Sequence, residues 1–71
     1  MRDIEEVAEE AMRQIIETRQ PLGLFYRMEA RRLYVGVDNS TGDAWTEEFR
    51  SRRQCLRWLR NPNLDAEGNE I

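Results

Sequence analysis

The 71 residues suffice for one small domain, because a domain of about 60 residues buries only ~60% of the surface that its unfolded chain exposes. Hydrophobic residues make up 39% of the chain and charged residues 35%, which excludes a disordered tail and is typical of a small soluble domain. All 11 basic residues are arginine, the 14 acids leave a net charge of -3, and there is no histidine.

These counts argue against an enzyme, a cofactor or a metal site. Histidine is the commonest general base and metal ligand, and the single Cys55 excludes an internal disulfide and a multi-cysteine zinc site. The acidic N-terminal segment has no apolar region typical of a signal peptide, and no run approaches the ~20 apolar residues of a membrane span. We therefore expect a cytoplasmic, bacterial-type protein without a membrane partner.

Residues 3–18 are predicted to form the first helix. Its apolar residues recur at helical spacing: Ile4, Val7, Ala8, Ala11, Met12, Ile15 and Ile16. Asp3 and Glu6 have the spacing of a capping pair, and Pro21 and Gly23 end the helix. The opposite face is a solvated acidic stripe of Glu6, Glu9, Glu10 and Glu17.

Three runs rich in aromatic and β-branched residues, 24–28, 33–37 and 44–49, are predicted to be strands. A four-residue loop at 29–32 would place Met28 opposite Leu33, Tyr26 opposite Val35 and Leu24 opposite Val37. A three-residue loop with Gly42 left-handed would place Val37 opposite Trp45. Both turns put the same residues on one face, so we expect a three-stranded antiparallel meander.

The second helix is predicted to begin after Ser51, an N-cap with Gln54 three residues later as in a capping box. Pro62 disfavours its continuation. Its apolar face contains Cys55, Leu56, Trp58 and Leu59, with Cys55 as a small core residue rather than a reactive thiol. These elements give one domain over residues 1–61, followed by a flexible acidic tail over 62–71.

The expected fold is α+β in the order αβββα, with both helices on one face of the meander. The covered face would bury Leu24, Tyr26, Met28, Leu33, Val35, Val37, Trp45 and Phe49. The other face would stay open, with Phe25 beside Gly36 and Thr46, and Arg27 beside Tyr34 and Glu48. The predicted partner-binding residues are therefore Phe25, Arg27, Tyr34 and Glu48.

The segment "DNSTGD" at residues 38–43 admits four interpretations. Gly42 is its fifth residue, whereas a calcium loop needs glycine at the sixth. A glycosylation acceptor needs a secretory compartment, and Ser40 or Thr41 as nucleophile needs a positioned base. We expect a hairpin turn in which Asp and Asn side chains bond the nearby backbone.

Glu47 lies between Trp45 and Phe49 on the face expected to be buried, where an unpaired carboxylate is costly and its pKa rises. One interpretation is a tuned acid or a specific pairing site. Another is a sheet edge, where Glu47 reaches solvent or an arginine and discourages strand-to-strand aggregation. A bulge that exchanges Glu47 with Glu48 is a third.

Residues 50–60 contain five arginines and no acid. Arg53, Arg57 and Arg60 cluster beside the apolar face of the helix and suit bidentate phosphate contacts. The alternative is that these arginines pair with the acidic first helix, which the negative net charge favours.

The helix–three strands–helix order resembles that of double-stranded RNA-binding domains, and Ser51-Arg52-Arg53 matches the basic cluster that opens their second helix. The alanine-rich second helix and the glycine-proline-histidine loop of that family are replaced here by 55–59 and 29–32. The string "GLFY…LYVGVDNSTGDAWTEEF…CLRWL" also resembles small uncharacterised proteins of bacterial prophages and mobile elements. That resemblance implies a cytoplasmic accessory protein that modulates a host or defence protein.

Two functions follow as hypotheses. The preferred one is a non-enzymatic protein-interaction module that uses the open sheet face, either for an unidentified protein partner or for self-association as a homodimer. The alternative is binding of RNA or DNA through Arg53, Arg57 and Arg60.

Overall fold

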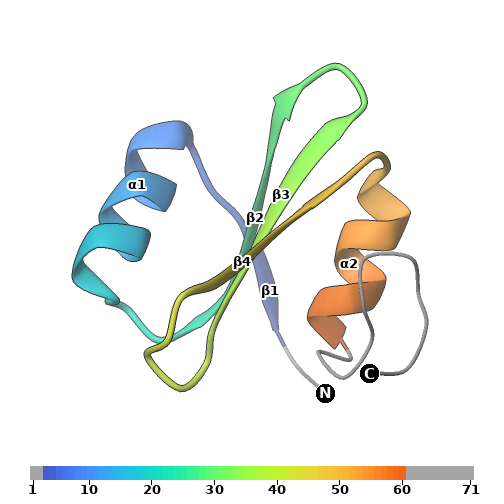
Figure 1. Cartoon of the computed structure of the whole chain (residues 1–71). Helices are drawn as coiled ribbons and strands as arrows, with labels where there is room; N and C mark the ends of the chain where they lie inside the picture. The colour runs from blue at the N-terminus through green and yellow to red at the C-terminus, as the bar shows by residue number, and fades with distance from the viewer. Residues whose placement is uncertain (1–2, 61–71) are drawn as a thin grey trace.

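The computed structural model describes residues 3–60. Its elements in chain order are β1 (Ile4–Glu6), α1 (Glu9–Thr18), β2 (Gly23–Ala30), β3 (Leu33–Asn39), β4 (Trp45–Phe49) and α2 (Arg52–Arg60). The four strands form one mixed sheet in the order β1-β2-β3-β4 (Figure 1). The flexible tail predicted over 62–71 lies outside the described residues. No helix within residues 3–60 is long and apolar enough to cross a membrane.

The α+β class and the antiparallel run of β2, β3 and β4 are confirmed. The prediction of one helix over 3–18 is wrong at its start, because residues 4–6 form a strand parallel to β2. Ile4 packs into the core on one side of the sheet and Val7 into the core on the other. Their spacing fits a helix, but the extended chain sends them to opposite faces. Ala8 therefore occupies the N-cap of α1, without a side-chain capping bond.

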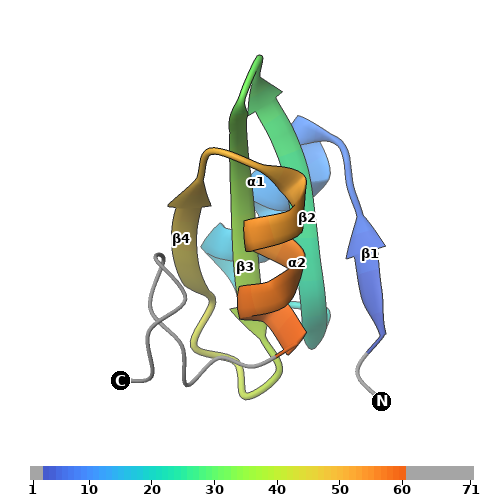
Figure 2. The ribbon, with the colours of Figure 1, turned by 90° about the vertical axis from the view of Figure 1, so that its right-hand side faces the viewer.

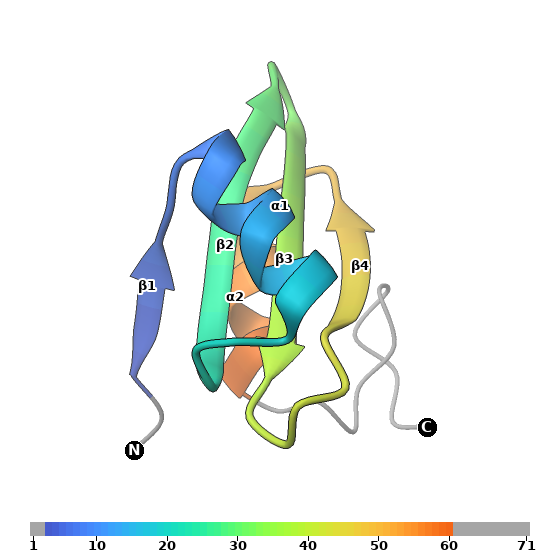
Figure 3. The same cartoon turned by 90° about the vertical axis from the view of Figure 1, so that its left-hand side faces the viewer.

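The two helices lie on opposite faces of the sheet, so the expected arrangement with both on one face is wrong. Figure 1 shows the sheet nearly edge-on between α1 and α2. Figure 2 shows α2 in front of β2 and β3, and Figure 3 shows α1 in front of the same two strands from the other side. The central strands are therefore covered twice, as in an α/β/α sandwich.

Both predicted registers are wrong by one residue, because β2 contains an irregularity before its turn and the β3–β4 connection is longer than three residues. The β2–β3 turn contains only Arg31 and Arg32, with an irregularity between Met28 and Ala30 that pairs Met28 with Tyr34. On the other side of β3, Asp38 pairs with Trp45. A slip of one residue turns every side chain of a strand to the other face, so β3 is inverted relative to the prediction.

The inversion divides the apolar side chains of β3 between two cores. On the α2 side, the buried cluster contains Leu24, Tyr26, Phe49, Cys55, Trp58 and Leu59, with Tyr34 packed against it. On the α1 side, it contains Met12, Ile15, Phe25, Val35 and Val37. Of the residues expected in a single core, Met28 is 53% exposed and Trp45 is 61% exposed. A strand covered on both faces needs apolar residues on both, and β3 supplies them.

Candidate functional site

The four residues predicted to bind a partner do not form an open sheet face. Phe25 is only 5% exposed and lies in the core beneath α1. Arg27 and Glu48 share the α1 side because both align with Val35 across the sheet. Tyr34 faces α2 instead. The predicted row of Arg27, Tyr34 and Glu48 is therefore wrong, since helix α1 covers the face and β3 is inverted.

Glu47 sits on the edge strand β4, beside Gly36 of β3, and is half-buried. Its Oε1 accepts a hydrogen bond from Nε1 of Trp45 at 3.2 Å. This environment agrees with the interpretation of Glu47 as an edge residue that reaches solvent. The bulge that would exchange Glu47 with Glu48 is absent from the β3–β4 pairing, which is continuous from Tyr34 to Asp38.

The segment at 38–43 is a turn built from its own side chains, as predicted. Oδ1 of Asp38 accepts hydrogen bonds from the Ser40 amide at 3.0 Å and from the Ser40 hydroxyl at 2.6 Å. Asn39 is fully buried, donates through Nδ2 to the Pro21 carbonyl at 2.8 Å and accepts at Oδ1 from the Ala44 amide at 3.0 Å. Asn39 thereby joins the loop before β2 to the loop before β4.

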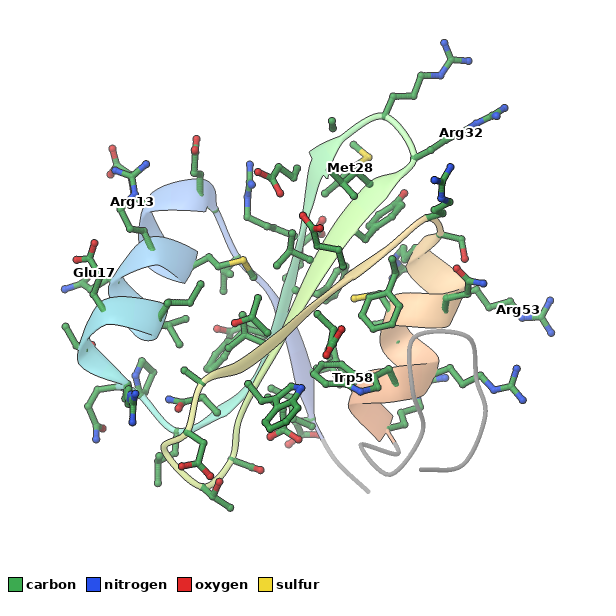
Figure 4. All side chains as sticks on the ribbon, in the orientation of Figure 1. Arg13, Glu17, Met28, Arg32, Arg53 and Trp58 are labelled. Carbon is green, nitrogen blue, oxygen red and sulfur yellow. The ribbon has the colours of Figure 1, made fainter. Side chains whose placement is uncertain are left out.

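Helix α2 begins and packs as the sequence predicts. The Ser51 hydroxyl accepts a hydrogen bond from the Gln54 amide at 3.1 Å, which caps the first turn. Cys55, Trp58 and Leu59 are buried against the sheet, and burial raises the pKa of the Cys55 thiol to about 12. The remaining faces of the helix carry arginines. Figure 4 shows Trp58 directed toward the sheet and Arg53 directed away from it.

The predicted arginine stripe of Arg53, Arg57 and Arg60 is exposed along α2. None of these side chains forms a salt bridge with a carboxylate of residues 3–60. The expected pairing with the acidic first helix is wrong, because α1 lies behind the sheet (Figure 1). The arginine stripe therefore faces solvent on the side of the molecule opposite to Glu9, Glu10 and Glu17.

A second group of arginines adjoins the stripe and was missed by sequence reasoning. The β2–β3 hairpin and the start of α2 enclose a groove of about 550 Å³. This arginine groove is lined by Met28, Arg31, Arg32, Tyr34, Arg50 and Arg52. Its two halves are about twenty residues apart in the sequence, so only the fold brings them together. The only sequence signal for the groove is the pair of arginine doublets, Arg31-Arg32 and Arg52-Arg53. The sequence does not show that these doublets lie close together in space.

Arg52 is the anchored member of the arginine groove. Its Nε donates to the hydroxyl of the buried Tyr26 at 3.1 Å, and its Cζ lies 5.6 Å from the centre of the Tyr26 ring. The hydrogen bond to Tyr26 raises the pKa of Arg52, and the charge of Glu6 contributes in the same direction. The hydrogen bond and the ring contact therefore hold the Arg52 guanidinium in a defined position at the junction of the groove and the stripe.

No group of three or more candidate metal ligands occurs within residues 3–60. The side chains that line the arginine groove offer guanidinium donors and an aromatic ring. Comparisons with protein families, with curated proteins and with solved structures find no match to this chain. The resemblances drawn from the sequence stay predictions.

Proposed function

We propose that the protein is a non-enzymatic module that binds the phosphate backbone of a nucleic acid through its α2 side. The observation that carries this proposal is the position of the helices on opposite faces of the sheet. The acidic residues of α1 cannot neutralise the arginines of α2 across the sheet. The position of the helices therefore argues against pairing of the arginine stripe with the acidic residues of α1.

The α2 side has the composition of a phosphate-binding surface although the whole chain is acidic. It presents the arginine stripe together with the four arginines of the arginine groove. Guanidinium groups suit bidentate contacts with phosphate oxygens. At 1.5 Å per residue the stripe extends over about 10 Å, enough for more than one phosphate. Charges of one sign on one face also steer a polyanion toward that face.

The proposal is tested by fluorescence anisotropy with labelled RNA and DNA over a range of salt concentrations. Binding should weaken steeply with salt, because displaced counterions dominate phosphate binding. The variant Arg53→Gln with Arg57→Gln removes two charges and keeps good helix formers. For this variant, the slope of log K against log salt concentration (the salt slope) should fall in magnitude by about 0.7 to 0.9 for each phosphate that is no longer neutralised.

The matched control is Arg13→Gln with Arg19→Gln, which removes two exposed charges from the α1 side. Arg13 forms only an exposed ion pair with Glu9, at 3.6 Å, so its removal has little effect on stability. The control should bind like the unmodified protein. Equal weakening by both pairs would show non-specific attraction, and no binding at low salt would refute the proposal.

A protein-interaction role is the second candidate, and an exposed apolar groove beside α1 favours it. Met12, Ile16 and Val35 form the apolar part of this groove of about 260 Å³, charged side chains of α1 and β2 form its rim, and Ile16 is 40% exposed. Arg27, one of the predicted partner-binding residues, also lines it. If the protein self-associates here, Ile16→Gln should lower its mass in sedimentation, whereas Leu22→Gln should not. A monomeric unmodified protein at high concentration would exclude self-association.

A further inference from the structure

The arginine groove differs from the arginine stripe in one respect: it contains an apolar surface beside its charges. Met28 is 53% exposed at the hairpin, and Figure 4 shows it near the hairpin tip with Arg32. Tyr34, opposite Met28 in the β2–β3 pairing, is half-buried and lines the same groove. The arginine groove therefore offers an apolar surface beside its guanidinium groups.

The charges of the groove come from both of its walls. Arg31 and Arg32 form the hairpin turn, while Arg50 and Arg52 precede and open α2. No acidic residue lines the groove. Arg52 is already oriented by Tyr26 through Nε, which leaves its two terminal amino groups available to an anion. An oriented guanidinium loses less conformational freedom on binding than a free one.

The size of the groove also limits the occupant. A volume of about 550 Å³ falls within the range of small-ligand sites. It is open at the surface between two elements, so a unit of a longer chain can enter it. In a duplex the bases are stacked and paired, so their faces are not accessible to a tyrosine. In a single strand the bases are free to stack on aromatic side chains while arginines hold the backbone.

We propose that the arginine groove holds one nucleotide of a single-stranded nucleic acid, with the base against Tyr34 and Met28 and the adjacent phosphate between the arginines of the two walls. This inference rests on the proposed function and specifies its ligand. The arginine stripe then follows the backbone of the same strand, because Arg52 of the groove and Arg53 of the stripe are consecutive.

The test compares a labelled oligothymidylate with an abasic oligomer of the same length, which has the same phosphates and no bases. The unmodified protein should bind the oligothymidylate roughly tenfold more tightly, as expected for stacking of one base. Tyr34→Leu keeps an apolar side chain against the core and should reduce this preference to near unity. Arg53→Gln with Arg57→Gln should weaken both oligomers equally and keep the preference.

A second variant avoids the core altogether, in case Tyr34→Leu does not fold. Arg31→Gln with Arg32→Gln changes only exposed residues of the turn and should lower the affinity for the oligothymidylate and its salt slope. A duplex of mixed sequence should bind more weakly than the single strand. A phosphotyrosine peptide should not displace the oligothymidylate from the groove.

The outcomes separate the two proposals. If the unmodified protein binds both oligomers equally and the stripe variant weakens both, the backbone proposal holds and the nucleotide proposal is overturned. The nucleotide proposal is also overturned if the duplex binds more tightly than the single strand. It is overturned as well if the phosphotyrosine peptide displaces the oligothymidylate from the unmodified protein and fails to bind the variant Arg31→Gln with Arg32→Gln. If neither oligomer binds, both proposals fall.

Discussion

Gly36 of β3 lies directly beneath Cys55 of α2: a Cβ on Gly36 would be 3.0 Å from the Cys55 Sγ. The same Cβ would be 3.4 Å from Cε3 of Trp58. Helix α2 therefore packs so close to the backbone of the central strand that a Cβ at position 36 would make its neighbours shift. This contact fixes the distance of the arginine-bearing helix from the sheet and from the β2–β3 hairpin.

Gly36→Ala should lower the free energy of unfolding by about 1–3 kcal/mol, because an added methyl group in a packed core forces its neighbours to move. Urea denaturation measures the change. In the double variant Gly36→Ala with Cys55→Ala, removal of the sulfur should recover part of this stability. Strictly additive effects would contradict the close approach of these two residues.

The Cys55 thiol should make stability fall at alkaline pH. Its pKa is raised from 9.0 to about 12 in the folded protein, so the unfolded chain releases the thiol proton first. The neutral thiol contributes fully to the free energy of unfolding below pH 9.0, and this contribution is lost as pH rises toward 12. The difference in the free energy of unfolding between the unmodified protein and Cys55→Ala should change by about 1 kcal/mol per pH unit in that window.

The comparison with Cys55→Ala isolates the thiol, because every other ionisable group is common to the two proteins. A constant difference between the two denaturation curves from neutral to alkaline pH would show that the thiol ionises in the folded state. The same result would be seen as rapid reaction of the native thiol with a disulfide reagent.

Asn39→Ala should destabilise the fold by about 2–4 kcal/mol, since it leaves the Pro21 carbonyl and the Ala44 amide without their buried partner. The loops before β2 and β4 would lose their connection. Thr41→Ala is the control, because the Thr41 hydroxyl bonds the exposed Asp43, and its effect should stay within about 0.5 kcal/mol. Similar unfolding midpoints for the two variants would argue against a bridging role of Asn39.

Ala8→Ser should stabilise α1 by about 1 kcal/mol, because serine at an N-cap accepts a hydrogen bond from the first turn. Ala8 has the extended backbone conformation of an N-cap but lacks a capping side chain. Thermal unfolding monitored by circular dichroism measures the gain. A decrease in stability would mean that α1 begins earlier, as the helical spacing of residues 3–18 predicted.

Local features of this chain were predictable, whereas those that depend on three-dimensional packing were not. The apolar face of α2 and its Ser51 cap follow from spacing within a few residues, and both are confirmed. The strand at 4–6 was missed because Ile4 and Val7 fit a helical period equally well. Its partner, β2, is separated from it by the whole of α1.

The site was predictable only in part, for the same physical reason. The stripe of Arg53, Arg57 and Arg60 lies on one helix, so its exposure follows from helical geometry. The groove depends on the turn at Arg31-Arg32 and on the irregularity between Met28 and Ala30, which together set the register of β3. The irregularity shifts the pairing by one residue, which inverts the strand and moves Tyr34 from the supposed open face to the arginine groove.

The most direct test is a nitrogen-15 NMR titration with an oligothymidylate at low salt, which locates binding without mutation. If the α2 side binds the nucleic acid, the amide shifts should change in residues 31–34 and 50–60, and those of α1 should stay in place. Changes centred on α1 and the groove at Ile16, or no changes while the protein remains folded, would contradict the account.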